Sequence, residues 1–260
     1  MRDIRAILLD VDGVIVGNEG LGALGRDSEM IKRLKEIREG GVQIILCTAR
    51  SAFAIKDIVE YANLDNLHVT DNGGTVISPI SGQVLRQVFI DENQARRVLE
   101  MCLANSFSTR AYTHEKSMIQ KSPQDVNEPI TRIGVTVADD IEKARFTELF
   151  SSLGTDLVLS WGMHNKAPLQ FGVVCAPGIS KRQGAMELLA HLGISPDNVL
   201  GIGDSTSDWS FMEICKFVGT MENGSDELKR LVATKGEGNY IIGGHVDANG
   251  VNKIFDYFLC

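Results

Sequence analysis

Two carboxylates follow directly on a short apolar run near the start of the chain. The run ends in Asp10 and Asp12, and Gly13 comes directly after them. Acidic side chains are rarely buried without a partner, so acids at the end of an apolar strand call for a compensating cation. Residues two apart in an extended strand point the same way. We therefore expect Asp10 and Asp12 to reach one substrate from opposite sides of its bridging oxygen.

Further polar residues stand at the ends of other predicted strands. Thr48 follows a second apolar run, Asp204 and Asp208 follow a third, and Lys181 opens the helix before that third run. Because active sites of open parallel sheets lie at the carboxyl ends of strands, these side chains are expected to converge. Several converging carboxylates repel one another unless a cation lies among them. Oxygen ligands without histidine or thiolate favour a hard ion, Mg²⁺.

This set of groups is typical of phosphoryl transfer. A carboxylate beside a metal ion can act as a nucleophile, and a second carboxylate two residues on can serve first as an acid and then as a base. A cation and polar donors would stabilise the phosphoryl oxygens during the transfer.

The residue pattern predicts an α/β domain that positions these groups. An apolar strand at Ile4–Leu9 precedes a helix capped by Ser28, a strand at Val42–Cys47 and a helix opened by Ser51. This alternation predicts a doubly wound parallel sheet with helices on both faces. The alternation resumes after Gly178, with a helix expected at 181–191, a strand at 198–202, a helix at 208–214, a strand at 217–219 and helices at 225–232 and 249–258.

Residues 81–175 interrupt that alternation and predict a separate α+β domain. A hairpin turns at Ser81-Gly82, a helix begins with a capping box from Asp91 to Gln94, and strand-like segments surround a second helix. The simplest organisation is a core of residues 1–80 and 176–260 with residues 81–175 inserted as a cap.

The composition excludes several classes of protein. The chain has 260 residues, 43% of them hydrophobic, and a net charge of −8, which argues against a nucleic-acid partner. No apolar run approaches the roughly 20 residues of a membrane helix, and the first residues do not read as a signal peptide. Five scattered cysteines without a CxxC pair indicate reduced thiols in a cytoplasmic protein. A monomer and a homodimer both remain open.

Four segments resemble, in order, the motifs of the haloacid dehalogenase-like phosphohydrolases. They are DVDGV, LCTAR, the lysine segment GISKRQGA and GIGDSTSD. The long insertion between the second and third motifs, with NGGTVIS and MENGSDELKR, is similar to the Cof-like branch, subclass IIB. The resemblance extends over the whole chain. It implies a Rossmann-like core with an α+β cap, and a phosphatase that hydrolyses a sugar phosphate or a phosphorylated hydroxy acid through an aspartyl phosphate.

The resemblance also implies a role for each motif residue. Asp10 would attack phosphorus, and Asp12 would protonate the leaving alcohol and then activate water. Thr48 would hydrogen-bond the phosphoryl group, and Lys181 would neutralise charge on Asp10 and the phosphate. The implied metal ligands are Asp10, Asp12 through its main-chain carbonyl, Asp204 and Asp208, the last of which could instead hold the lysine.

Other residues are expected to contact the substrate near these motifs or from the cap. They are Gly13, Ala49, Arg50, Asn72, His164 and Lys166. His164 and Lys166 belong to the segment WGMHNK near the end of the cap. Either could bind a second anionic group of the substrate, such as a carboxylate.

The chain departs from the family pattern at three positions without losing a catalytic group. Val14, Ala49 and Ser207 replace the commoner threonine, glycine and asparagine. The NagD-like branch is disfavoured because its second motif reads TNN. Two other functions remain open: a phosphosugar mutase of the same superfamily, and a non-catalytic sensor of a phosphorylated ligand. The mark of a sensor would be the loss of Asp12 or Lys181, and both are present.

Overall fold

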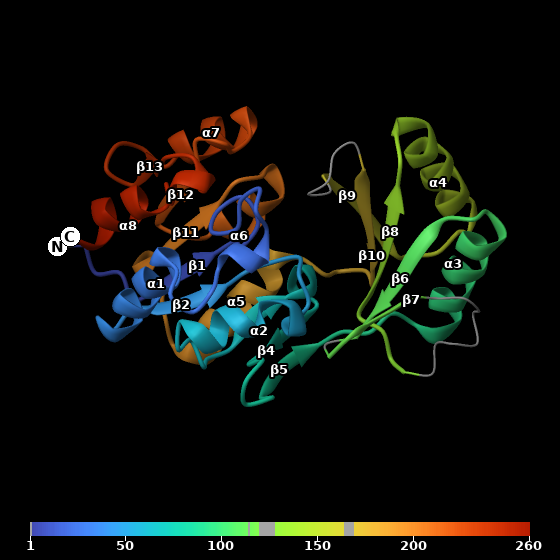
Figure 1. The fold of residues 1–260 in the computed structure, drawn as a ribbon, viewed down its shortest axis with the longest axis horizontal. Coiled ribbons are helices and arrows are strands. Elements are labelled where there is room, and N and C mark those ends of the chain that lie inside the picture. The colour runs from blue at the N-terminus through green and yellow to red at the C-terminus, as the bar shows by residue number, and fades with distance from the viewer. Residues whose placement is uncertain (1, 114, 120–127, 164–168) are drawn as a thin grey trace. The chain divides into compact units, whose positions relative to one another are not determined.

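The computed structural model describes residues 2–113, 115–119, 128–163 and 169–260. The chain forms two compact units (Figure 1). The first, here called the core unit, comprises Met1–Arg86 and Ser180–Cys260, and the second, the inserted unit, comprises Gln87–Ile179.

A five-stranded parallel sheet forms the centre of the core unit. The order is β13-β12-β11-β1-β2, with bounds Tyr240–Ile242, Phe217–Thr220, Val199–Gly203, Ala6–Leu9 and Gln43–Leu46. Leu9, the last residue of β1, pairs with Leu46 on one side and Ile202 on the other. The carboxyl ends of β11, β1 and β2 therefore meet at one edge of the sheet, and the predicted doubly wound fold is confirmed.

Helices cover both faces of this sheet because its strands are apolar on both sides. Ile7 and Leu9 pack among α1, α2 and α8, whereas Ala6 and Leu8 pack among α5, α6 and α7. The helix bounds are Glu29–Glu39 for α1, Ala52–Tyr61 for α2, Lys181–Leu192 for α5, Trp209–Met212 for α6, Asp226–Ala233 for α7 and Asn252–Leu259 for α8. The hydroxyl of Ser28 caps α1, as predicted, by accepting a hydrogen bond from the N–H of Ile31.

A small sheet of β3 (His68–Thr70), β4 (Thr75–Ile77) and β5 (Val84–Gln87) continues the core unit beyond β2. The buried ring of His68 joins the two sheets. Its Nδ1 accepts a hydrogen bond from the N–H of Leu46 at 3.1 Å, so Nε2 carries the proton and donates to the carbonyl of Leu64 at 3.0 Å. Burial lowers the pKa of His68 to about 4, which the bond to Leu64 only partly opposes. The ring is therefore neutral.

The inserted unit is an antiparallel sheet with two helices and a hydrophobic core of its own. The order is β7-β6-β8-β10-β9, with bounds Ser117–Ile119, Ser108–Tyr112, Arg132–Val137, Gln170–Cys175 and Val158–Met163. The helices are α3 (Glu92–Ala104) and α4 (Asp140–Ser152). Phe146 of α4 lies at the centre of this core, edge-on to Phe107 and Trp161. The carboxylate of Asp91 caps α3 by accepting from the N–H of Gln94, but the side-chain oxygen of Gln94 makes no hydrogen bond in return within the described residues, so only half of the predicted capping box forms.

The end of the chain differs from the prediction in two respects. The last helix begins at Asn252 rather than at Asn249, because Asn249 adopts a left-handed φ of 51° that ends a preceding 3₁₀ turn. The strand β13 was not predicted.

All five cysteines are free, four of them buried and Cys260 exposed. None of the helices in the described ranges is long and apolar enough to cross a membrane.

Candidate active site

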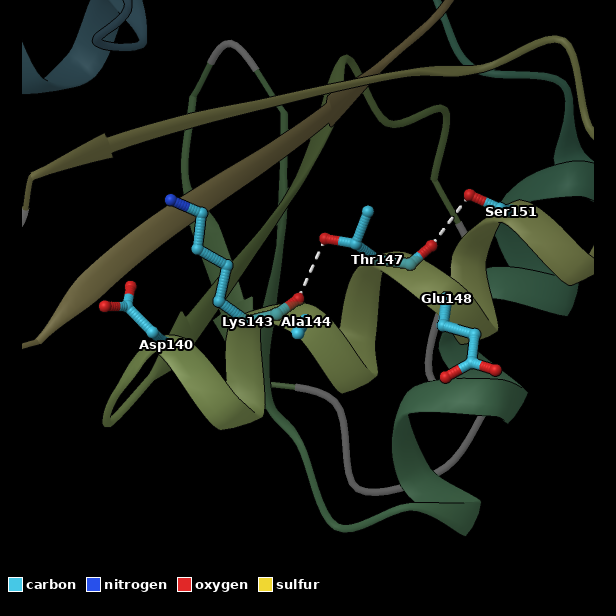
Figure 2. A pocket seen from close by; sticks show the side chains of 6 residues that line it. All are labelled: Asp140, Lys143, Ala144, Thr147, Glu148 and Ser151. Carbon is cyan, nitrogen blue, oxygen red and sulfur yellow. Dashed lines mark hydrogen bonds between the residues drawn. The ribbon is translucent and has the colours of Figure 1, made fainter.

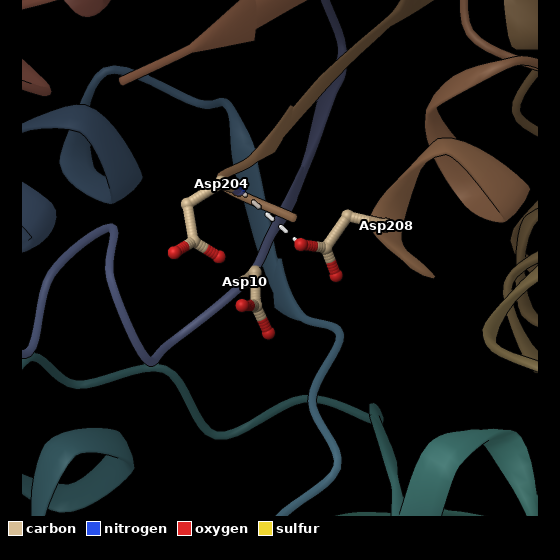
Figure 3. A group of neighbouring side chains, drawn as sticks. All are labelled: Asp10, Asp204 and Asp208. Atoms are coloured by element: carbon tan, nitrogen blue, oxygen red, sulfur yellow. Dashed lines mark hydrogen bonds between the residues drawn. The ribbon is translucent and has the colours of Figure 1, made fainter. Parts of the chain in front are cut away.

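Three carboxylates converge at the carboxyl edge of the core sheet (Figure 3). Asp10 follows β1, Asp204 follows β11, and Asp208 lies four residues further on. One carboxylate oxygen from each lies within 4.8 Å of the others. The N–H of Asp10 donates to the carbonyl of Ile202 at 2.9 Å, so the pairing of β1 with β11 continues as far as the acid itself. Sheet register thus brings together residues that are far apart in the sequence.

Lys181 bridges two of these acids. Its Nζ donates to Asp10 Oδ1 at 2.8 Å and to Asp208 Oδ1 at 2.6 Å, and all three side chains are buried. The side chain extends from the first residue of α5, which the hydroxyl of Ser180 caps by accepting from the N–H of Gln183. Burial lowers the pKa of Lys181, but attraction by Asp10 and Asp208 outweighs it and raises the pKa. The lysine is therefore a fixed positive charge.

Asp208 uses its second oxygen to fix the backbone beside Asp204. Its Oδ2 accepts hydrogen bonds from the N–H groups of Asp204 and Ser205 at 3.2 and 3.0 Å and from the Ser205 hydroxyl at 2.8 Å. It closes a 3₁₀ turn, Thr206–Asp208, so the helix predicted to begin at Asp208 begins at Trp209. Both oxygens of Asp208 are thereby committed to positioning neighbours.

The cluster holds more negative charge than Lys181 can balance. Burial, and then repulsion by Asp208, raise the pKa of Asp10 well above its usual range despite the nearby lysine. The same two causes raise the pKa of Asp204 to about 7. Burial raises the pKa of the nearby Cys47 thiol, which leaves it neutral. The available ligands are thus carboxylate oxygens, and such a donor set fits Mg²⁺.

The carboxylate of Asp12 lies outside this cluster, and the metal-ligand role expected for Asp12 is that of its main-chain carbonyl. Because β1 ends at Leu9, Asp12 does not share an extended strand with Asp10. Instead, both oxygens of Asp12 accept from Arg50, Oδ2 from Nε at 2.8 Å and Oδ1 from Nη2 at 2.6 Å. The two acids therefore have different partners, Lys181 for Asp10 and Arg50 for Asp12.

Gly13 allows the loop that carries Asp12 to pass close to Asp204. Its φ is +74°, and a Cβ added there would lie 1.9 Å from Asp204 Oδ2. Its N–H donates to the carbonyl of Val16 at 2.9 Å. Any side chain at position 13 would displace Asp204.

Thr48, Arg50 and Asn72 are also brought together. The hydroxyl of the buried Thr48 accepts from the N–H of Arg50 at 3.1 Å, and its carbonyl accepts from the N–H of Asn72 at 3.2 Å. Ala49, between the first two, is half-buried. The other two residues predicted to contact the substrate, His164 and Lys166, lie outside the described residues.

Sequence reasoning gave no role to Asn223, which joins three of the loops at this edge. Its Nδ2 donates to the carbonyl of Gly13 and its Oδ1 accepts from the N–H of Val246, both at 2.9 Å. An available signal was the Asn-Gly pair in MENGSDELKR, shortly after a predicted strand of the parallel sheet. Asn223 thus holds the loop after β1 against those after β12 and β13.

A hollow on the surface of α4 in the inserted unit carries no comparable chemistry (Figure 2). Its lining comes from one helix: Asp140, Lys143, Ala144, Thr147, Glu148 and Ser151. The hydroxyls of Thr147 and Ser151 already donate to carbonyls of the same helix, both at 2.8 Å. We therefore assign the candidate chemistry to the acid cluster of the core unit.

Several known proteins resemble this chain over most of its length. A phosphoglycolate phosphatase of Nitrosopumilus maritimus is 24% identical over 225 residues, covering 86% of each chain. The Bacillus subtilis 5-amino-6-(5-phospho-D-ribitylamino)uracil phosphatase YcsE is 22% identical over 229 residues, covering 87% of each. The solved structure of a subclass IIB sugar phosphatase has the same fold, with a TM-score of 0.73, 16% identity and 98% coverage of both chains.

The family model described as haloacid dehalogenase-like hydrolase matches residues 7–149 and 125–254. These matches span most of the chain and include all four motifs that suggested the resemblance. The chain therefore belongs to the haloacid dehalogenase-like hydrolases and has the fold of subclass IIB.

Proposed function

We propose that this protein is a Mg²⁺-dependent phosphatase that hydrolyses a small phosphorylated metabolite through an aspartyl-phosphate intermediate. Phosphatase activity as such follows from the family and from relatives that bear phosphatase names. The observation that carries the mechanism is the buried lysine that joins Asp10 to Asp208 beside Asp204. This arrangement supports a site in which the excess negative charge of the acids can bind a further cation, with a phosphoryl group beside it.

In the proposed reaction, a carboxylate oxygen of Asp10 attacks phosphorus and the bond to the leaving oxygen breaks. Asp12 gives that oxygen a proton and later takes one from the water that attacks the phosphoryl-aspartate, whereupon the P–O bond to Asp10 breaks and inorganic phosphate leaves. Thr48 donates its hydroxyl hydrogen to a phosphoryl oxygen, and Lys181 offsets charge on Asp10 and the phosphate. Asp10, Asp204 and the carbonyl of Asp12 would hold Mg²⁺, which would supply positive charge to offset that of the phosphoryl oxygens.

The proposed substrate is a sugar phosphate or a phosphorylated hydroxy acid. Two relatives, named phosphoglycolate phosphatase and 5-amino-6-(5-phospho-D-ribitylamino)uracil phosphatase, support a small organic phosphate in general. We assign the inserted unit, Gln87–Ile179, the role of a substrate-selecting cap, predicted from the sequence at residues 81–175, in which His164 or Lys166 binds a second anionic group.

A phosphate-release screen over a panel of phosphorylated metabolites tests the function, with the Asp10→Asn protein as the blank. We expect turnover of at least one sugar or hydroxy-acid phosphate, its loss in the blank or with chelator, and its return with added Mg²⁺. Isomer formation that needs a bisphosphate activator would identify a mutase instead. Tight binding of a phosphorylated ligand without any release would identify a sensor.

A further inference from the structure

The turn Asp71–Gly74 has an unusual backbone. Asp71, Asn72 and Gly73 have successive φ values of 50°, 58° and 95°, and only the last of these residues is glycine. Residues with a side chain rarely adopt this left-handed region, and such conformations persist only where the surrounding structure imposes them. The turn is almost completely buried at Asp71. Its contacts should therefore reveal what it is built to hold.

One set of contacts holds the loop that carries Thr48 and Arg50. The N–H of Asp71 donates to the carbonyl of Arg50 at 2.9 Å, and the N–H of Asn72 donates to that of Thr48 at 3.2 Å. The hydroxyl of Ser51 donates to the Asp71 carboxylate at 2.6 Å, although Ser51 was expected only to open α2. The turn thus fixes the backbone on both sides of Arg50, whose side chain donates two hydrogen bonds to Asp12.

A second set of contacts holds the start of α5. A Cβ added to Gly73 would lie 2.0 Å from the carbonyl oxygen of Ser180 and 3.0 Å from the nitrogen of Lys181. Gly184, one turn further along α5, also lies against the turn, since a Cβ there would be 3.1 Å from the Cα of Gly73. Only glycine at position 73 lets the helix that presents Lys181 begin where it does.

A third contact comes from Arg86. Its Nε donates to the carbonyl of Gly73 at 3.2 Å, and its Nη1 donates to Glu187 of α5 at 2.5 Å. Arg86 is the last residue of the core unit before the chain enters the inserted unit, and Ser180 is the first after it returns. Both connections of the inserted unit are therefore anchored on Gly73.

We propose that the Asp71–Gly74 turn is a positioning element that ties both connections of the inserted unit to two parts of the candidate active site. Through Asp71 and Asn72 it places the loop bearing Thr48 and Arg50, and through Gly73 it places Lys181. None of the turn's three left-handed residues needs to touch the reacting atoms. The catalytic meaning of this placement rests on the proposed function, whereas the placement itself does not.

Gly73→Ala tests the proposal, with Gly41→Ala as its matched control. Gly41 has a φ of +91° in the loop between α1 and β2, and an added Cβ there would meet no atom within 4 Å. Both substitutions introduce a similar backbone strain, but only the first displaces α5. We expect Gly73→Ala to lower kcat by roughly ten- to a hundredfold with KM changed less than about threefold, because misplacement by about an ångström has effects of this size. Gly41→Ala should keep the wild-type kcat.

Amide hydrogen exchange provides a readout that does not depend on turnover. Gly73→Ala should accelerate exchange in both residues 48–51 and residues 180–184, whereas Gly41→Ala should accelerate neither. Equal exchange in the two variants, or equal kcat values, would overturn the proposal. If the wild type releases phosphate from no substrate, the proposed function fails, and the exchange result alone decides whether the turn positions these segments.

If Gly73→Ala does not fold, Arg86→Lys tests the same proposal. Lysine can keep the ion pair with Glu187 but lacks the planar fork that also reaches the Gly73 carbonyl. Arg182→Lys is its control. Arg182 lies on α5, the helix that also carries Glu187, and pairs with Glu213 at 2.8 Å on the surface. We expect a lower kcat and faster exchange in residues 180–184 for Arg86→Lys alone. Wild-type values in both variants would overturn the proposal.

Discussion

Lys181 is the residue on which the charge balance of the site depends. It donates to Asp10 and Asp208 from a buried position, and the acids it serves repel one another. Lys181→Met keeps most of the side-chain volume but removes the charge. Breaking a buried ion pair costs about 3–5 kcal/mol because the remaining charge has no partner, so we expect the free energy of unfolding to fall by about 3 kcal/mol.

Denaturant unfolding of this variant, with and without Mg²⁺, measures the effect. Because a metal ion can replace part of the missing positive charge, Mg²⁺ should stabilise Lys181→Met more than the wild type. Arg182→Met is the control, since this neighbouring arginine forms an exposed ion pair worth at most about 1 kcal/mol. Equal losses in the two variants would contradict the assignment of Lys181 as the central counter-charge.

Arg50 fixes the orientation of Asp12 through two hydrogen bonds, one to each carboxylate oxygen. Lysine keeps the charge but cannot hold both oxygens in one plane. We expect Arg50→Lys to lower kcat by about tenfold with little change in stability, because Asp12 must be aligned with the leaving oxygen to transfer its proton. Arg26→Lys, which alters an exposed ion pair with Glu60, should leave phosphate release unchanged. An unaltered kcat in Arg50→Lys would show that Asp12 needs no such alignment.

At the scale of elements, the positions of the acids at strand ends could be predicted because apolar strands and their boundaries are local features. The register that sets Asp10 beside Ile202, and hence Asp204 near Asp10, follows from the parallel pairing of β1 and β11. The pairing of Asp12 with Arg50 could not be predicted, since it depends on β1 ending at Leu9 and on a loop held from elsewhere. The role of Asn223 likewise depends on contacts between three loops.

The junction of the two sheets in the core unit predicts a specific sensitivity to acid. His68 has a pKa of about 4 in the folded protein, mainly because of burial, against 6.5 when unfolded. Between these values the unfolded chain binds a proton that the folded chain does not, so stability is present above pH 6.5 and is lost as the pH falls toward 4. The difference amounts to about 3 kcal/mol at most.

His68→Gln isolates this contribution, since glutamine can accept from Leu46 and donate to Leu64 without titrating. The free energy of unfolding should fall more steeply between pH 6.5 and 4.5 in the wild type than in His68→Gln. Subtracting the two curves cancels the other titrating groups. Parallel curves would contradict the prediction, because they would mean that His68 has the same pKa in the folded and the unfolded protein.

At the scale of the whole molecule, the site exists only when the chain is folded. Lys181 and Asp10 are 171 positions apart in the sequence, and the inserted unit lies between them. An unfolded chain therefore offers no such cluster of carboxylates to a metal ion. Any ion bound by the cluster must stabilise the core unit as a whole, by about 1.4 kcal/mol when its concentration is tenfold above its Kd.

The stabilisation of the fold by a bound metal ion should increase with pH. Burial, and then repulsion by Asp208, raise the pKa of Asp204 to about 7, so below pH 7 a proton competes with the metal for this carboxylate. The increase in Tm on adding Mg²⁺ should therefore be small at pH 5.5 and should grow as the pH rises through 7, with the affinity at pH 6 about tenfold below its limit. Asp204→Asn should abolish the increase, whereas Asp197→Asn, at an exposed acid, should preserve it. An increase in Tm that is equal at pH 5.5 and pH 8 would mean that Asp204 is already ionised in the metal-free protein, and that Lys181 and solvent balance the cluster more fully than its burial implies.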